Sequence, residues 1–209
     1  MAIDGEIIEG SCSFDTKTIT GESNYKDAKV GDKVYGGFVS VNGSVKVKAE
    51  KSYSESTLKL IVDIVEQSAI KKSKNYKKDV AEKSILVTSD TVVVVDNIIL
   101  GKPKNVQEAK EFLRLLSSKT HKVITGCCLK THNNKIKYFS EQTVVKFKEL
   151  TEEEIDFYVN KYKPFDKAGA YGIQEWIGAI GIENIQGDYY NVVGFPCYKF
   201  FELAKEITE

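Results

Sequence analysis

Residues 84–103 read Ser-Ile-Leu-Val-Thr-Ser-Asp-Thr-Val-Val-Val-Val-Asp-Asn-Ile-Ile-Leu-Gly-Lys-Pro. Residues 85–95 are almost continuously apolar or β-branched, which is typical of a strand buried on both faces. The Asp-Asn pair at residues 96 and 97 suits a two-residue hairpin turn. The stretch therefore predicts two antiparallel strands joined by a tight turn.

Asp90 interrupts the first of these strands. An ionised carboxylate in a buried strand is costly unless a cation, a metal ion or several hydrogen-bond donors meet it. If the turn lies at residues 96 and 97, the register carries Lys102 back opposite Thr91, one residue from Asp90. The alternative interpretation is a strand-end carboxylate satisfied by backbone donors. The flanking Ser89 and Thr91 and the returning Lys102 favour a functional site.

The composition indicates a chain without a dominant charge. Among 209 residues, 30 are acidic and 30 are Lys or Arg, so no global field favours nucleic acid or a membrane as a partner. No apolar run approaches the roughly 20 residues of a spanning helix, and the N-terminus lacks the features of a secretory signal. The four cysteines lack metal-ligand spacing and are expected to be reduced thiols, which favours the cytoplasm.

The first 53 residues are rich in glycine and in short β-prone pieces separated by turn signals. Asn42-Gly43, between two alternating segments, predicts a hairpin turn. The next segment has the apolar period of a helix, which we expect to end near Ala69. Residues 71–78, Lys-Lys-Ser-Lys-Asn-Tyr-Lys-Lys, predict a solvated linker, with a phosphate-binding patch as the less favoured alternative.

Helical and strand-like segments alternate beyond residue 103, which predicts an α/β fold. The expected helices are 105–117, 155–162 and 197–207, and the expected strands are 123–131 and 136–147. His121 and His132 show no partner in the sequence and are expected at the surface or at strand ends.

A second polar stretch spans residues 165–174, Phe-Asp-Lys-Ala-Gly-Ala-Tyr-Gly-Ile-Gln. Its small residues would let the backbone approach a ligand closely, and Asp166, Lys167 and Gln174 would supply polar contacts. From the pattern alone, a ligand-binding loop and an ordinary polar loop with glycines are equally favoured.

Several motifs occur in a fixed order through the second part of the chain. They are Ser89-Asp90-Thr91, Gly101-Lys102-Pro103, the 165–174 stretch, Gly181-Ile182-Glu183, and residues 185–189 and 191–196. Over about residues 81–207 this set resembles the Maf family of nucleotide pyrophosphatases. The resemblance implies a mixed sheet flanked by helices, and a cytoplasmic enzyme that hydrolyses nucleoside triphosphates to the monophosphate and pyrophosphate.

The resemblance also implies roles for individual residues. Asp90 would be the general base that activates the attacking water, and Lys102 would neutralise phosphate charge. Thr91 and Gln174 would determine base specificity, and with Lys102 they resemble the branch that acts on dTTP and UTP.

The chemistry suits these residue types. Attack by water on an α-phosphate needs a base, together with cations for the charge on the phosphate oxygens and the leaving group. By the same resemblance, Asp166 and Lys167 would face the triphosphate or its metal ion. Carboxylates suit a hard divalent cation, so Mg²⁺ is the expected cofactor, held by Asp90 and Asp166.

The family's opening segment is not found ahead of Ser84. That segment is a strand, a phosphate-binding Ser-Pro-Arg-Arg loop, a helix and a further catalytic Glu. Each lost catalytic group can lower the rate by on the order of 10² to 10³. We therefore expect weak or no activity unless the N-terminal module or another chain, as in a homodimer, completes the site.

The first part of the chain has motifs of its own. They are Asp4-Gly5-Glu6-Ile7-Ile8-Glu9-Gly10, Thr20-Gly21-Glu22-Ser23, Gly31-Asp32-Lys33-Val34 and Asn42-Gly43-Ser44. Over residues 3–70 these resemble the actuator domain of metal-transporting P-type ATPases. In that family the Glu matching Glu22 positions water to hydrolyse an aspartyl-phosphate on another domain. The sequence has no such partner domain, so we expect Glu22 to be structural or vestigial.

The expected organisation is a mainly-β actuator-like module ending in a helix (1–70), a Lys-rich linker (71–80) and a partial Maf-like α/β domain (81–209). The favoured function is a pyrophosphatase acting on dTTP- or UTP-type nucleotides. The alternatives are a non-catalytic nucleotide-binding or interaction module, and a fusion related to a P-type ATPase without selected activity. The expected partner is the nucleotide, with no nucleic acid and no membrane, and a homodimer is left open.

Overall fold

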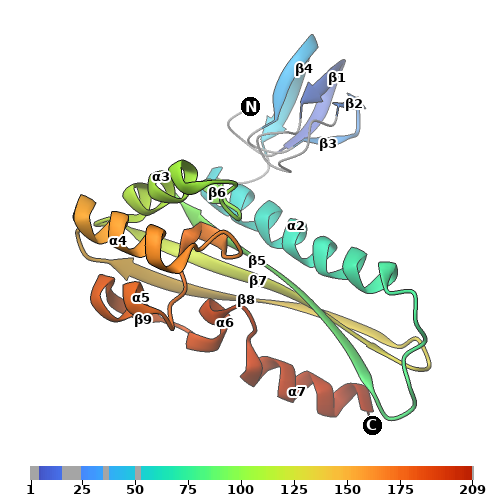
Figure 1. Ribbon diagram of the computed structural model, residues 1–209. Helices are drawn as coiled ribbons and strands as arrows, with labels where there is room; N and C mark the ends of the chain where they lie inside the picture. The colour runs from blue at the N-terminus through green and yellow to red at the C-terminus, as the bar shows by residue number, and fades with distance from the viewer. Residues whose placement is uncertain (1–4, 16–24, 35–37, 50–52, 209) are drawn as a thin grey trace. The chain divides into compact units, whose positions relative to one another are not determined.

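The computed structural model describes residues 5–15, 25–34, 38–49 and 53–208 (Figure 1). The chain divides into two compact units, residues 1–64 and 65–209, and each is described by itself. None of the helices in these ranges is both long and apolar enough to cross a membrane. Glu22 lies outside the described residues.

The first unit contains a small antiparallel sheet. Its strands are β1 (Gly5–Asp15), β2 (Tyr25–Lys29), β3 (Lys33–Val34) and β4 (Val39–Ala49), and β1 pairs with each of the others. A compact apolar cluster that includes Ile7 and Phe14 forms its core. The expected mainly-β module is therefore confirmed for the described residues.

The hairpin predicted at Asn42-Gly43 is wrong. β4 runs straight through both residues and pairs with β1 on either side of them. Gly43 has a φ of 78°, and the register shifts nearby, as at a β-bulge. Since β1 is as long as β4, it offers pairing partners along the whole segment, and the glycine is absorbed as a local irregularity.

The second unit is built on a five-stranded sheet with the order β6-β5-β7-β8-β9. The strands are β5 (Ile85–Val95), β6 (Ile98–Leu100), β7 (Thr120–Thr131), β8 (Ile136–Phe147) and β9 (Ile182–Gln186). The α/β class with helices flanking the sheet is confirmed. The sheet itself was expected to be mixed, whereas every described pair of its strands is antiparallel.

Helices cover both faces of this sheet (Figure 1). They are α2 (Tyr53–Asn75, of which residues 65–75 belong to this unit), α3 (Val106–Leu116), α4 (Glu152–Tyr162), the short η1 (Ala168–Ala170), α5 (Trp176–Gly181), α6 (Tyr189–Val193) and α7 (Cys197–Thr208). A Cβ added to Gly126 in β7 would lie 2.6 Å from the backbone of Val65 in α2. The next residue, Cys127, faces the other way and packs with Ile207 of α7.

α2 continues to Asn75, beyond its predicted end near Ala69, so the first part of the lysine-rich stretch is helical. The predicted domain limits at residues 70 and 81 stay a prediction.

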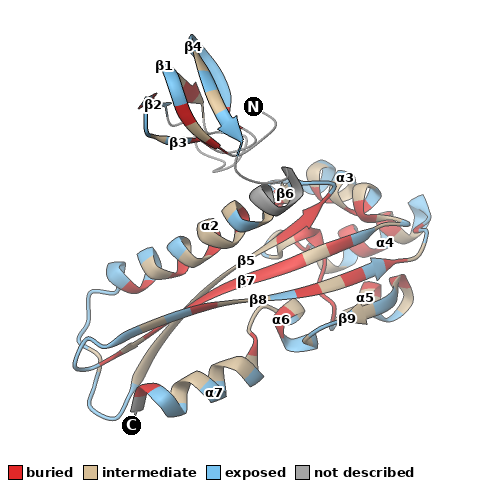
Figure 2. Ribbon diagram, turned by 180° about the vertical axis from the view of Figure 1, so that it is seen from behind, coloured by how far each residue is buried: buried red, intermediate tan, exposed pale blue. Residues whose placement is uncertain are grey.

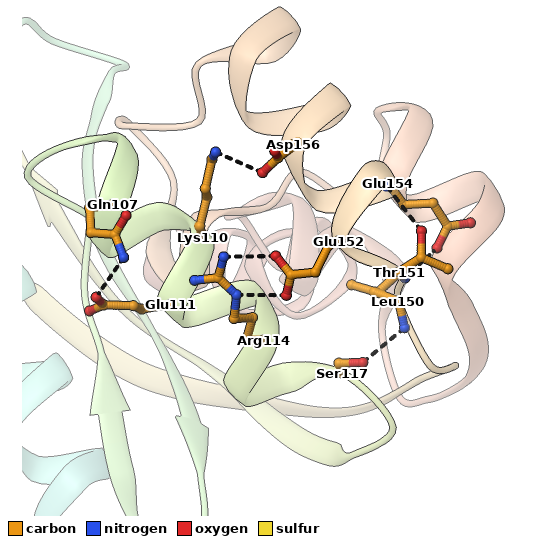
Figure 3. A network of polar contacts seen from close by, with 10 residues as sticks. All are labelled: Gln107, Lys110, Glu111, Arg114, Ser117, Leu150, Thr151, Glu152, Glu154 and Asp156. Atoms are coloured by element: carbon orange, nitrogen blue, oxygen red, sulfur yellow. Dashed lines mark hydrogen bonds and ion pairs between the residues drawn. The ribbon is translucent and has the colours of Figure 1, made fainter.

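The main core lies at one end of the sheet, where β5, β7 and β8 meet α3, α4 and residues 168–177. Figure 2 shows the buried positions concentrated in these strands. α3 and α4 are also joined at their exposed surfaces (Figure 3). There, two guanidinium nitrogens of Arg114 donate to the two carboxylate oxygens of Glu152 at 2.7 Å each, and Lys110 lies 2.7 Å from Asp156. This end of the sheet positions the loop described below.

Candidate functional site

The β5–β6 hairpin forms as predicted. Val95 pairs with Ile98, and Asp96 and Asn97 both have positive φ angles, of 50° and 63°. Such a turn twists in the same sense as its flanking strands. The ladder ends at Leu100, so Lys102 lies just beyond the paired part of the hairpin.

Among the described residues, no strand pairs with one edge of β5 beside Asp90. β6 pairs only with residues 93–95 of β5, whereas β7 pairs with residues 85–94. Accordingly residues 85–92 are half-buried, and the predicted burial on both faces holds only for residues 93–95. Successive side chains of a strand point to opposite faces, so an open edge lets both Asp90 and Thr91 border one cavity.

A pocket of about 300 Å³ lies at this edge. All six site residues predicted in this part of the chain line it, namely Asp90, Thr91, Lys102, Asp166, Lys167 and Gln174. They come from β5, from the segment after β6 and from the loop between α4 and α5. The structure thus brings these residues together, while their individual roles stay predictions.

The Asp90 carboxylate is held by two side chains from α2. The Ser68 hydroxyl donates to one carboxylate oxygen, and the Lys72 ammonium lies 2.7 Å from the other. Lys72 also donates to the Ser89 carbonyl at 2.9 Å. The Asp90 carboxylate therefore meets both a hydroxyl donor and a cation, which offsets the cost of its partial burial.

Lys72 lines the pocket and was missed as an individual site residue. It falls in the lysine-rich stretch that was interpreted as a solvated linker. Its spacing of four residues from Ser68 places both side chains on one face of a helix, and this spacing was the available signal. The minor interpretation of the stretch, a phosphate-binding patch, stays a prediction.

The Thr91 hydroxyl belongs to a network of hydrogen bonds among buried hydroxyl and amide groups. The Thr91 and Thr125 hydroxyl oxygens lie 2.9 Å apart, and Thr125 donates to the Asn191 carbonyl at 3.4 Å. The Asn191 side-chain amide donates to the Val123 carbonyl at 3.1 Å and to the Thr143 hydroxyl at 3.0 Å. Thr125, Thr143 and Asn191 are fully buried, so the Thr91 hydroxyl rests on a rigid polar layer.

Lys167 lies between two carboxylates, 3.0 Å from Asp166 and 3.2 Å from Glu175. Burial lowers the pKa of Lys167, but its hydrogen bonds to both carboxylates outweigh that effect, and the net pKa is raised. The same ion pair with Lys167 lowers the pKa of Asp166. Both groups therefore stay charged at neutral pH.

His121 was expected at the surface or at a strand end. It is the second residue of β7, so it lies at a strand end, but it is buried and not at the surface. Its side chain is 1% exposed, between the rings of Phe147 and Tyr171, and its Nε2 lies 2.7 Å from the Tyr171 hydroxyl oxygen. Burial lowers the pKa of His121 to about 4. The His121 side chain lies on the face of β7 that packs against the 165–174 loop, which carries Tyr171. His132 is exposed, as predicted.

The charges around the pocket suit an anionic ligand. Three lysines, Lys72, Lys102 and Lys167, line it together with two aspartates, Asp90 and Asp166. Within the described ranges, no group of three or more His, Cys, Asp or Glu side chains could hold a metal ion. A cation at this site would therefore depend on one or two carboxylates and on oxygens of the ligand itself, which is how Mg²⁺ is usually bound.

Comparison with known families places these features in context. The family model for Maf-like protein matches residues 39–207, and the model for the P-type ATPase actuator domain matches residues 1–66, so the two overlap at 39–66.

Individual relatives agree with the first of these matches. A dTTP/UTP pyrophosphatase of Porphyromonas gingivalis is 47% identical over 128 residues, which is 61% of this chain and 64% of the relative. A Phocaeicola vulgatus protein of the same name is 45% identical over 66% of this chain and 72% of the relative. One from Flavobacterium psychrophilum is 45% identical over 75% and 80%. The chain thus spans less than two thirds of the Porphyromonas protein. By the extent of the family match and by these relatives, the chain belongs to the Maf-like protein family.

Proposed function

We propose that this chain binds a nucleoside triphosphate in the Asp90 pocket and hydrolyses dTTP or UTP to the monophosphate and pyrophosphate. The observation that carries the proposal is the convergence of the Asp90 carboxylate and three ammonium groups on one cavity of about 300 Å³. The relatives described above bear the name of this activity.

The residues of the pocket suit the reaction step by step. Asp90 would accept a proton from a water molecule while the water oxygen attacks the α-phosphorus. The bond from this phosphorus to the bridging oxygen breaks, and pyrophosphate leaves with the electron pair. Lys72, Lys102 and Lys167 would stabilise the negative charge that develops on the phosphate oxygens. Lys72 has three N–H donors and uses two on Asp90 and Ser89, so one remains for a phosphate.

We include a divalent cation, most simply Mg²⁺, in this proposal. Asp90 and Asp166 both line the pocket, and two carboxylates with phosphate oxygens form a suitable set of hard ligands. When bound, such an ion would neutralise phosphate charge and orient the triphosphate.

Thr91 and Gln174 are proposed to recognise the base. Both line the pocket, and the Thr91 hydroxyl is fixed by its contact with Thr125. A hydroxyl held in one orientation discriminates between hydrogen-bonding partners better than a freely rotating one.

The first unit is proposed to be an actuator-like module fused to the Maf-like part. Its support is the family match to residues 1–66 and the β-rich structure of the described residues. Because Glu22 is expected to be structural or vestigial, we expect Glu22→Gln to leave pyrophosphate release unchanged. A loss of more than about tenfold in kcat/KM, a cost typical of a catalytic group, would instead make Glu22 part of the site.

We further propose that the enzyme works in the cytoplasm and that a homodimer supplies further phosphate donors at the open edge of β5. Sedimentation velocity tests the second point, since a strictly monomeric and fully active protein would exclude it.

The experiment that tests the function is pyrophosphate release from dTTP and UTP with Mg²⁺, with dATP for comparison. Asp90→Asn should lower kcat/KM by about 100-fold or more, as expected for loss of a general base. Asp96→Asn is the matched control, because Asp96 lies in the same hairpin and pairs with Lys119 at the surface. Equal rates for the wild type and Asp90→Asn would overturn the assignment. Calorimetry with dTTP adds a second outcome, since binding without turnover would indicate a nucleotide-binding module.

A further inference from the structure

A continuous chain of hydrogen bonds joins α4 to the loop that carries Lys167. The Gly172 backbone N–H donates to the Tyr158 hydroxyl oxygen at 3.0 Å, and the Tyr158 hydroxyl donates to Oε2 of Glu175. The other carboxylate oxygen of Glu175, Oε1, lies 3.2 Å from Nζ of Lys167. We refer to Tyr158, Glu175 and Lys167 as the clamp.

The clamp is anchored in the core. Tyr158 is fully buried, and its ring stacks on Tyr162 with 5.0 Å between the ring centroids. Burial, and then the hydrogen bond to Glu175, raise the pKa of Tyr158, so its hydroxyl remains a donor at any working pH. A buried hydroxyl that both donates and accepts has one preferred orientation, and it fixes the carboxylate that it meets.

Gly172 provides the space that the clamp occupies. A Cβ at this position would lie 2.8 Å from Cε of Lys167 and 2.9 Å from Cδ of Glu175. The side chains of Lys167 and Glu175 therefore pack directly against the backbone of the loop. A glycine here allows the close approach, and a larger residue would displace the ends of these two side chains.

Asp166 lies slightly closer to the Lys167 ammonium than Glu175 does, but Glu175 is the better anchored of the two carboxylates. The Asp166 side chain is 74% exposed, whereas that of Glu175 is 20% exposed and is itself held by Tyr158. Exposed ion pairs fix geometry weakly because solvent screens them and both side chains keep their freedom. Asp166 is thus free to turn toward a ligand while Glu175 keeps the ammonium in place.

We propose that Tyr158 and Glu175 are positioning residues that hold the Lys167 ammonium in the pocket, ready for the triphosphate. The inference rests on the proposed function, and it adds two residues that do not line the pocket themselves. They act on the ligand only through Lys167.

The test is a double-mutant cycle on triphosphate hydrolysis. Tyr158→Phe and Glu175→Gln should each lower kcat/KM by about 10- to 100-fold, the effect of a misplaced catalytic group. In the Lys167→Ala background the same changes should cost less than about threefold, because the group that they position is gone. Tyr162→Phe is the matched control, since Tyr162 lies one turn further along α4, and it should retain wild-type activity. If Tyr158→Phe and Glu175→Gln lowered kcat/KM by the same factor in the Lys167→Ala background as in the wild type, the proposal would be overturned.

A readout without turnover separates this proposal from the proposed function. In the free protein, NMR should detect a slowly exchanging Tyr158 hydroxyl proton and a protected Lys167 ammonium, and Glu175→Gln should abolish the protection of both. If these signals are present but the wild type hydrolyses no triphosphate, the clamp is supported and the proposed hydrolase function is wrong. If the wild type lacks them, the clamp is wrong whatever its activity.

Discussion

The ammonium of Lys72 in α2 lies 2.7 Å from the carboxylate of Asp90 in β5. A lysine from the stretch that was expected to act as a linker thus meets the aspartate around which the site is built. The Maf-like match, which begins at residue 39, also includes this helix. The contact makes α2 a supplier of site residues and gives Asp90 a cation that the sequence motif does not reveal.

Replacing Lys72 should separate activity from stability. The Lys72 and Asp90 side chains are 49% and 32% exposed, so the ion pair should contribute less than about 1 kcal/mol to folding. Lys72→Ala should nevertheless lower kcat/KM for dTTP by about 10-fold or more, because a charge facing the phosphates is lost. Lys71→Ala, on the exposed side of the same helix, is the control. Equal activity of the two variants, measured by pyrophosphate release, would exclude Lys72 from the site.

Gly126 should be required for the close packing of α2 on β7. An added methyl group there would meet the backbone of Val65 at 2.6 Å, which is closer than real contacts allow. Gly126→Ala should therefore destabilise the fold by about 1–3 kcal/mol and weaken the hold of α2 on Asp90. Urea unfolding checks this. Gly101→Ala is the control, because nothing lies within 4 Å of its added Cβ. Identical unfolding midpoints for the two variants would contradict the close packing of α2 on β7.

His121 should make folding sensitive to mild acid. Burial lowers its pKa from 6.5 to about 4, so between these values the unfolded chain binds a proton that the folded chain does not. The contribution of neutral His121 to the free energy of unfolding is complete above pH 6.5 and is lost as the pH falls toward 4. The loss amounts to roughly 3 kcal/mol. The unfolding free energy of wild type minus that of His121→Gln should fall over this range. A flat difference would mean that His121 is not buried as described.

Thr125 should influence base preference through Thr91. Thr125→Val keeps the shape of the buried side chain but removes the partner of the Thr91 hydroxyl. Loss of one such hydrogen bond, worth about 1 kcal/mol, should narrow the preference for dTTP over dATP by roughly fivefold. Thr120→Val, at the exposed start of the same strand, serves as the control. An unchanged ratio of kcat/KM values in Thr125→Val would remove Thr125 from the recognition of the base.

Local patterns predicted the elements of the second unit well. The strand expected at residues 136–147 forms as β8 with the predicted bounds, and Asp96-Asn97 forms the predicted turn. At the start of α4, Thr151 and Glu154 form a capping box, in which each side chain accepts a hydrogen bond from the other residue's backbone N–H. These features depend on neighbours within a few residues, which the sequence displays directly.

Features that depend on distant contacts could not be predicted in this way. Asn42-Gly43 is a strong turn signal, but a long partner strand keeps it extended. His121 is buried because β7 brings it to Tyr171, fifty residues later in the chain. Lys72 reaches the site because α2 is longer than its apolar period indicates and packs over Gly126. In each case tertiary packing decides between local alternatives of similar energy.

The most direct test of the central claim is the fate of isotopic oxygen during hydrolysis of dTTP in ¹⁸O-labelled water with Mg²⁺. Attack by water on the α-phosphorus, assisted by Asp90, predicts that the label appears in the thymidine monophosphate and not in the pyrophosphate. Asp90→Asn should form this labelled product at least about 100-fold more slowly than the wild type. Label in the pyrophosphate, or equal labelling rates in the wild type and Asp90→Asn, would contradict the account.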